Sequence, residues 1–161
     1  MRLWPALLAM LLLAACAHPW NAIGLPVGTP RDQVLAKAGP PVRVLPLEGG
    51  GQRLQYTLQP AGQQAFMVDL DATGRLVSAR QVLTAADFNR IQNDLWTRAD
   101  VEREFGPPAL IDTVGSWRGA VMTYRWSDGS DMFYWVYLDP KGVVRRAHPG
   151  IEHVNAPNDR D

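Results

Sequence analysis

The sequence predicts an α+β protein made of two tandem units, each a short helical segment packed on a four-stranded antiparallel sheet. Short apolar runs that alternate with polar residues recur about every ten residues, and this spacing is typical of an antiparallel meander. A helical segment ending in Gly-Pro-Pro precedes each set of four runs. In addition, an ordered series of residues from the first half returns 67 or 68 positions later, which indicates duplication.

The first unit, residues 29–83, is expected to be one helix followed by four strands. Thr29 is expected to be the N-cap and Pro30 the first helical residue. The helix should end at Gly39-Pro40-Pro41, because glycine accepts a left-handed backbone and proline cannot continue a helix. Turn residues then delimit strands at 42–47, 53–58, 65–70 and 75–83.

The second unit, residues 84–148, is expected to repeat this plan with one additional helix. The first helix, 84–91, begins at Thr84, and the second carries Val101 and Phe105 before it ends at Gly106-Pro107-Pro108. Strands are expected at 110–114, 120–126, 132–138 and 143–147. Residues 149–161 contain proline and many polar residues and are expected to form a flexible tail.

Comparison of the two units distinguishes the two faces of the hairpin at 120–138. Alternate residues of a strand point to the same face, and one alternating set is apolar in both units, so this set is assigned to a core beneath the helices. The opposite parity differs between the units: Ala65, Met67 and Asp69 in the first correspond to three aromatic residues in the second. The residues expected to face away from the helices in the second unit are Val121, Thr123, Arg125, Phe133, Trp135 and Tyr137.

This ring-bearing face is a candidate protein-binding surface. Three large aromatic side chains together could expose roughly 300 to 500 Å², close to the largest apolar patch of an ordinary monomer. In the alternative interpretation, loops, the C-terminal tail or the first unit cover the rings. Trp117 and Arg118 in the preceding loop would extend either arrangement.

The N-terminus has the features of an export signal. Arg2 supplies a positive charge, residues 3–13 form an apolar stretch too short to span a bilayer, and Ala14-Ala15 precede Cys16. This pattern resembles a bacterial lipoprotein signal, which would be cleaved before Cys16 and would leave that thiol lipidated. The alternatives are an ordinary secretory signal with a chance cysteine and a short membrane anchor. Since Cys16 is the only cysteine, no intramolecular disulfide can form.

The lipoprotein resemblance also predicts the location of the mature chain. Residues 1–15 would be the signal peptide, and residues 16–28, which contain prolines and glycines, would be a lipidated tether. By resemblance to known sorting rules, the non-acidic Ala17 favours the outer membrane. The protein is therefore expected to be lipid-anchored and to face the periplasm.

Composition and spacing favour neither nucleic-acid binding nor catalysis. After cleavage, 15 basic residues would stand against 16 acidic ones, and the densest basic group, Arg145-Arg146 with His148, is interpreted as a solvated strand edge. His148 and His153 lack the cysteine or carboxylate partners of a zinc site, and no Ser-His-Asp or Cys-His order is present. We therefore expect no cofactor, no metal, no nucleic acid and no enzymatic activity.

Several of these features together resemble a known family. The lipobox cysteine, the helix ending in Gly-Pro-Pro, Tyr56, and the hairpin sequence Val-Asp-Leu-Asp-x-x-Gly at 68–74 resemble the SmpA/OmlA (BamE-type) outer-membrane lipoprotein domain. Two such units in tandem are similar to the β-lactamase-inhibitor-protein-like arrangement. The resemblance implies a non-catalytic protein-interaction role in envelope or outer-membrane protein assembly or integrity. The alternatives are inhibition of a periplasmic enzyme through the sheet face and an uncharacterised hydrolase.

Overall fold

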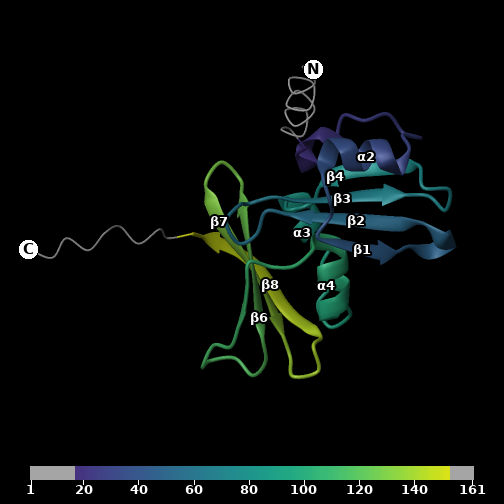
Figure 1. The fold of residues 1–161 in the computed structure, drawn as a ribbon. Coiled ribbons are helices and arrows are strands. Elements are labelled where there is room, and N and C mark those ends of the chain that lie inside the picture. Colours follow the sequence, from purple (N-terminus) through teal and green to yellow (C-terminus); the bar gives the residue numbers. More distant parts are fainter. Residues whose placement is uncertain (1–16, 153–161) are drawn as a thin grey trace, which may run out of the picture. The chain divides into compact units, whose positions relative to one another are not determined.

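The computed structural model describes residues 17–152 as an α+β fold with two four-stranded antiparallel sheets (Figure 1). The strand order follows the chain in both sheets: β1-β2-β3-β4 and β5-β6-β7-β8. The chain divides into two compact units, of which the first contains the described residues up to Tyr56 and Phe66–Arg80, and the second contains Thr57–Ala65 and the described residues from Gln81 on. Within residues 17–152 no helix is both long and apolar enough to cross a membrane.

The first half of the chain contains the predicted helix and all four predicted strands. Their ends differ from the predicted ones by no more than two residues, because turn-forming residues delimit each apolar run. The elements are the 3₁₀ helix η2 (Pro19–Ala22), α2 (Arg31–Ala38), β1 (Arg43–Pro46), the 3₁₀ helix η3 (Glu48–Gly50), β2 (Gln52–Thr57), β3 (Ala65–Leu70) and β4 (Leu76–Gln81).

Helix α2 begins differently from the prediction. Its N-cap is Pro30, and no side chain caps the helix. The Thr29 hydroxyl, expected to do so, instead donates a hydrogen bond to the Pro26 carbonyl at 2.6 Å. The end of the helix agrees with the prediction, since Gly39 has a φ of 83° and its N–H donates to the Leu35 carbonyl.

Residues 17–28, expected to be a tether, lie against the first unit. The His18 N–H donates to the Lys37 carbonyl at 3.0 Å, and Ala22 is completely buried. The prolines and glycines that suggested a linker instead form η2 and the turns after it. Composition indicated turns correctly, but it could not reveal this pairing with α2. Cys16 and the expected signal peptide lie outside the described residues.

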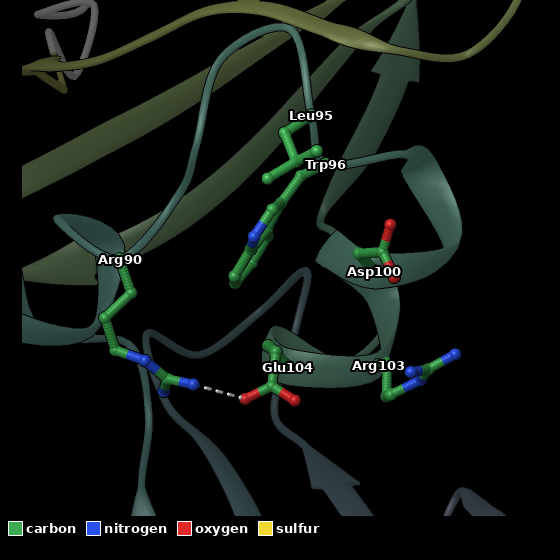
Figure 2. Close-up of a pocket in the computed structure, with 6 residues that line it drawn as sticks. All are labelled: Arg90, Leu95, Trp96, Asp100, Arg103 and Glu104. Atoms are coloured by element: carbon green, nitrogen blue, oxygen red, sulfur yellow. Dashed lines mark hydrogen bonds and ion pairs between the residues drawn. The ribbon is translucent and has the colours of Figure 1, made fainter.

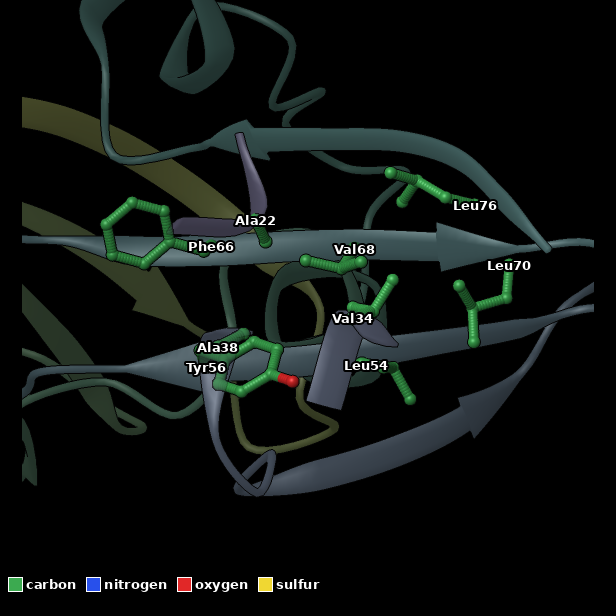
Figure 3. Close-up of a cluster of buried hydrophobic side chains, with 9 residues drawn as sticks. All are labelled: Ala22, Val34, Ala38, Leu54, Tyr56, Phe66, Val68, Leu70 and Leu76. Atoms are coloured by element: carbon green, nitrogen blue, oxygen red, sulfur yellow. The ribbon is translucent and has the colours of Figure 1, made fainter. Parts of the chain in front are cut away.

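The core of the first unit contains an apolar cluster to which η2, α2, β2, β3 and β4 contribute residues (Figure 3). Val34 and Ala38 come from one side of α2, and Ala22 comes from η2. The tyrosine ring of Tyr56 lies among them, with its hydroxyl bonded to the Gly39 carbonyl at 3.0 Å. The buried residues of the cluster are Ala22, Val34, Ala38, Leu54, Tyr56, Phe66, Val68, Leu70 and Leu76.

The second half also follows the predicted order of elements. Helix α4 begins with a capping box, in which the Thr97 and Asp100 side chains accept hydrogen bonds from each other's backbone N–H groups. The last strand extends to Ile151, so Pro149–Ile151, expected to begin a flexible tail, form strand; residues 153–161 lie outside the described residues. The elements are α3 (Ala85–Phe88), α4 (Arg98–Phe105), β5 (Leu110–Asp112), β6 (Val121–Ser127), β7 (Asp131–Leu138) and β8 (Val144–Ile151).

Stacked aromatic rings fill the core of the second unit. Phe88 of α3 lies parallel to Tyr134 of β7, with 3.9 Å between ring centroids, and Phe105 of α4 lies 5.0 Å from Phe88. Tyr124 of β6 meets Phe105 at 6.0 Å. Aromatic burial of this kind is worth more than its area alone, because the ring pairs attract one another electrostatically.

Three contacts recur at corresponding positions of the two units. Tyr124 donates to the Gly106 carbonyl at 2.8 Å, as Tyr56 does to Gly39. Asp71 and Asp139 each accept a hydrogen bond from the backbone N–H four residues ahead, at 3.0 Å in both turns. The N–H at the first residue of each helix, Arg31 or Arg98, donates to the carbonyl of a hairpin glycine. These contacts are compatible with a tandem arrangement of two equivalent units.

Candidate binding site on the second sheet

The second sheet separates its residues by parity as the repeat predicts. Met122, Tyr124 and Trp126 of β6 are buried, and so are Tyr134, Val136 and Leu138 of β7. The six candidate residues occupy the intervening positions. The pairing across β6 and β7 sets Val121 opposite Tyr137, Thr123 opposite Trp135 and Arg125 opposite Phe133, so the register brings all six together on one face.

The three aromatic residues of β7 continue into a connected set of rings. Phe133 lies 5.7 Å from Trp135, and Trp135 lies 5.4 Å from the imidazole of His148 on β8. That imidazole stacks on Tyr137 at 5.5 Å, and Trp117 meets the same tyrosine edge-on at 5.3 Å. We call Phe133, Trp135, Tyr137, Trp117, Arg146 and His148 the aromatic face.

A cation completes the aromatic face at its Tyr137 end. The guanidinium carbon of Arg146 lies 4.2 Å from the Tyr137 ring centroid, which is the geometry of a cation–π contact. Arg146 Nη2 also lies 3.1 Å from His148 Nε2. The indole N–H of Trp117 donates to the Leu138 carbonyl at 2.7 Å and thereby fixes that ring beside Tyr137. Each ring is therefore oriented by at least one defined neighbour.

Gly150 provides the space that the Trp135 ring occupies. It pairs with Phe133 across β7 and β8, and a Cβ added to it would lie 2.2 Å from Cζ3 of Trp135. Such a distance is impossible between non-bonded carbons. The indole therefore occupies the space that a Cβ at position 150 would fill, and only glycine there permits this.

The aromatic face is partly covered from within its own unit. Phe133, Trp135 and Tyr137 are half-buried, so they expose less surface than the sequence led us to expect. Strand β8 and Trp117 supply part of the cover, which corresponds in part to the alternative interpretation of intramolecular shielding. Val121 is only 4% exposed and is therefore removed from the candidate set, since a partner could not reach it.

Arg125 has an intramolecular role. Its guanidinium pairs with the Glu152 carboxylate at 2.9 Å and donates to the carbonyls of Pro60 and Ala61. Gln59 bonds the backbone of the same arginine through both its amide nitrogen and its amide oxygen. Arg125 thus holds segment 57–65 within the second unit, while Thr123 remains half-buried between Leu110 and Trp135.

Sequence reasoning missed the contribution of β8. His148 and Arg146 were interpreted as a solvated edge, yet both face the β7 rings. Period-2 alternation in β8 would have placed the two on one face, but which β7 residues they meet depends on the register. The pairing of β7 with β8 shifts its register between Tyr137 and Leu138, and no residue pattern in the sequence predicts that shift.

A second depression lies beside α4 (Figure 2). It encloses about 350 Å³ and has Trp96 at its centre, with Arg90 and Glu104 joined across it by an ion pair at 2.9 Å. The Asp100 carboxylate on its wall is already bonded to Thr97 in the capping box. Arg90, Glu104 and Asp100 of this cavity are therefore engaged in holding the helix and its neighbours.

The titratable groups with shifted pKa values have structural explanations. Hydrogen bonds from the Arg75 backbone and the Thr73 hydroxyl lower the pKa of Asp71, and the Val143 backbone N–H and Arg145 do the same for Asp139. Both carboxylates close hairpin turns. Within residues 17–152, no three His, Cys, Asp or Glu side chains come together in a manner that could hold a metal ion.

Compared with known proteins, the chain matches no family model and no curated protein.

Proposed function

We propose that this protein is a lipid-anchored outer-membrane lipoprotein that faces the periplasm and acts as a non-catalytic protein-interaction module. Its partner would be an envelope or outer-membrane protein, whose assembly or integrity it supports. In this proposal the chain consists of two tandem SmpA/OmlA-like units, each with a helical segment packed on its sheet, and Cys16 carries the lipid.

The observation that carries the proposal is the aromatic face of the second sheet. Six ring or guanidinium side chains lie in one connected set, and four of them, Trp117, Trp135, Tyr137 and Arg146, are of the types enriched at binding hot spots. They are half-buried or exposed, so their outer edges remain accessible.

Rigidity of the rings supports binding further. Trp135 is fixed over Gly150, and Trp117 is fixed by its bond to the Leu138 carbonyl. Side chains that are already ordered lose little conformational entropy when a partner binds, and each would otherwise cost about 0.5–1.5 kcal/mol to immobilise. A preorganised face of this kind suits recognition of a protein surface.

The first sheet offers no equivalent. At the corresponding positions it has Ala65, which is completely buried, Met67, which is 1% exposed, and Asp69, which is paired with Arg53 at 2.7 Å. The two units thus differ at these three positions, where Phe133, Trp135 and Tyr137 of the second unit correspond to two buried residues and a paired carboxylate. This difference between otherwise equivalent units favours a specialised role for the second sheet.

Partner capture from native envelopes tests the binding face. The full lipoprotein and its Trp135→Ala variant would be crosslinked in envelopes, purified and compared by quantitative mass spectrometry. Removing a central hot-spot ring is worth about 2 kcal/mol or more, so we expect recovery of the specific partner to fall at least roughly tenfold. Leu95→Ala is the matched control, because Leu95 is 68% exposed in the same unit but lies outside the aromatic face. Equal recovery with Trp135→Ala would reject the face.

The lipid anchor is tested separately. Cys16→Ser removes the only thiol that could be acylated. We expect the variant to lose palmitate labelling and to leave the membrane fraction. Unchanged membrane retention would contradict lipid anchoring.

A further inference from the structure

The first described residues hold the chain close to the surface of the first unit. A Cβ on Gly39, at the end of α2, would lie 3.6 Å from Cβ of Ala17. The next residue, His18, donates to the Lys37 carbonyl, and the Asn21 side chain donates to the same carbonyl at 3.2 Å. Ala17 is therefore held at the C-terminal end of α2.

The proposed lipid anchor joins the described chain at this point. Cys16 is covalently bonded to Ala17, so a lipid that it carries reaches the first unit through Ala17. The anchor would therefore be attached beside the C-terminal end of α2. Residues 17–22 lie against the first unit, so they do not form a flexible linker that lifts it away from the bilayer.

Exposed apolar side chains lie next to this attachment point. Trp20 is 46% exposed and Ile23 is 37% exposed. They are three residues apart at η2, where the Ile23 N–H donates to the Trp20 carbonyl, and side chains at this spacing in a 3₁₀ turn lie on the same side. The ring centroids of Trp20 and Phe66 lie 5.1 Å apart in an edge-to-face arrangement, which orients the indole while part of its surface stays in solvent.

The composition of the segment suits a lipid surface. Residues 17–30 contain no Asp, Glu, Lys or Arg, so contact with the interface requires no such charge to be desolvated. Lys37, in the last turn of α2, is exposed, and its backbone carbonyl receives the two bonds from this segment. Tryptophan near an aliphatic side chain and a cation is the combination that occupies the headgroup region of membranes.

We infer that the first unit docks directly on the lipid surface through Trp20 and Ile23, beside the acylated Cys16. The inference rests on the proposed lipidation of Cys16. Four residues from Cys16 to Trp20 span at most about 14 Å, and interfacial side chains enter the headgroup and acyl boundary by roughly 5–10 Å. An anchored chain therefore brings the indole within reach of the interface without unfolding any described contact.

Site-directed spin labelling tests this contact. In the acylated protein the Cys16 thiol is blocked, so an Ile23→Cys variant offers a single reactive thiol. The full lipoprotein would be reconstituted in phosphatidylethanolamine–phosphatidylglycerol vesicles and labelled with a nitroxide. We expect the label at position 23 to collide several-fold more with lipid-soluble oxygen than with a water-soluble nickel chelate. The matched control is Val77→Cys: Val77 is 51% exposed on β4 and has the opposite parity to the core residue Leu76. Its label should show the reverse preference.

The outcomes separate docking from anchoring. Label uptake by the wild-type protein would reveal a free Cys16 thiol and would overturn both the anchor and the docking. No uptake by wild type, combined with an aqueous label at position 23, would overturn the docking alone. A Trp20→Cys label repeats the measurement at a second position, so that a local effect of one substitution cannot decide the result.

Discussion

At the scale of single residues, each unit depends on a tyrosine that closes the end of its helix. Gly39 and Gly106 have almost the same backbone, with φ of 83° and 78°, and each presents its carbonyl to a tyrosine hydroxyl from a central strand. Burial raises the pKa of Tyr56 to about 12, an effect that the charge of Arg31 opposes. The hydroxyl therefore remains a proton donor throughout the physiological range.

Tyr124→Phe removes this donor and leaves the buried Gly106 carbonyl without its partner. We expect the free energy of unfolding to fall by about 1–3 kcal/mol, the usual cost of an unsatisfied buried group. Urea unfolding at pH 7 measures it. Tyr137→Phe is the control, since the Tyr137 hydroxyl makes no hydrogen bond that the structure records within residues 17–152. A Tyr124→Phe variant as stable as this control would contradict the assigned role.

Gly150→Ala places a methyl group where the Trp135 ring lies. We expect a loss of about 1–3 kcal/mol in unfolding free energy and a changed near-ultraviolet circular dichroism spectrum, because the indole must leave its position. The cost should largely disappear in a Trp135→Ala background, since the clash then has no second partner. If the same cost persisted in that background, it would arise from the backbone of β8.

The sequence predicted the buried residues well and the exposure of the rings poorly. Parity follows directly from alternation, so Tyr124 and Val136 could be assigned to the core from the repeat alone. Cover over Trp135 depends on which β8 residue lies opposite, and a register cannot be deduced from alternation. Likewise, nothing in the sequence showed that Arg125 would be engaged by Glu152 and segment 57–65.

At the scale of elements, the two corresponding helices start by different means. Helix α4 has a capping box, whereas α2 begins at Pro30 without a side-chain cap. Thr29 matches the preferred residue types for a cap, and it failed as one because its hydroxyl bonds Pro26. Residue preference identifies a helix start to within about a residue but does not fix the cap.

Thr97→Ala removes the side-chain cap of α4. A lost cap typically costs about 1 kcal/mol, so the midpoint of urea unfolding should fall accordingly. Thr113→Ala, at an exposed loop position, serves as the control and should stay within about 0.5 kcal/mol of wild type. Equal stability of the two variants would mean that the capping box contributes nothing in solution.

The same capping box gives a pH dependence. Hydrogen bonds from the Thr97 hydroxyl and backbone lower the pKa of Asp100 below its usual 3.8. A carboxyl with a lowered pKa in the folded state contributes its full stabilisation above the unfolded value and loses it as the pH falls through the folded value. We therefore expect Asp100→Asn to reduce the slope of unfolding free energy against pH below about pH 4, measured by urea titrations from pH 7 to pH 2. An unchanged slope would contradict the assignment.

Strand β8 shows that proline and glycine do not always mark the end of a strand. Pro149 and Gly150 suggested that the last strand ends early, yet β8 includes both. It is an edge strand of the sheet, and Pro149 pairs with Tyr134 of β7, so the proline interrupts no second ladder. The glycine is required by Trp135 rather than by a turn.

At the scale of the whole molecule, the chain crosses between its two compact units three times. The divisions fall after Tyr56, after Ala65 and after Arg80, so segment 57–65 belongs to the unit formed by the C-terminal half. The repeat suggested a single boundary between residues 83 and 84. A repeat shows which residues correspond, but not which loop is held by a distant arginine.

A fragment containing only residues 81–161 should therefore be less stable than the same residues in the full chain. It lacks the carbonyl partners of Arg125 at Pro60 and Ala61. We expect faster amide exchange across β6 in the fragment, measured by hydrogen exchange and mass spectrometry. In the full chain, Arg125→Ala should accelerate exchange in segment 57–65, and Arg118→Ala, at an exposed loop position, should leave it unchanged. Identical protection of β6 in fragment and full chain would show that the segment is dispensable.

The hydrogen bond from the Tyr124 hydroxyl to the Gly106 carbonyl has a consequence for redesign of the second sheet. In the second sheet this bond and the buried rings of Tyr124, Trp126 and Tyr134 lie on one side of β6 and β7, so half-buried side chains on the other side can be replaced without removing either. Replacement of Phe133, Trp135 and Tyr137 of β7 by three other side chains is therefore a direct way to change the surface that the second sheet presents.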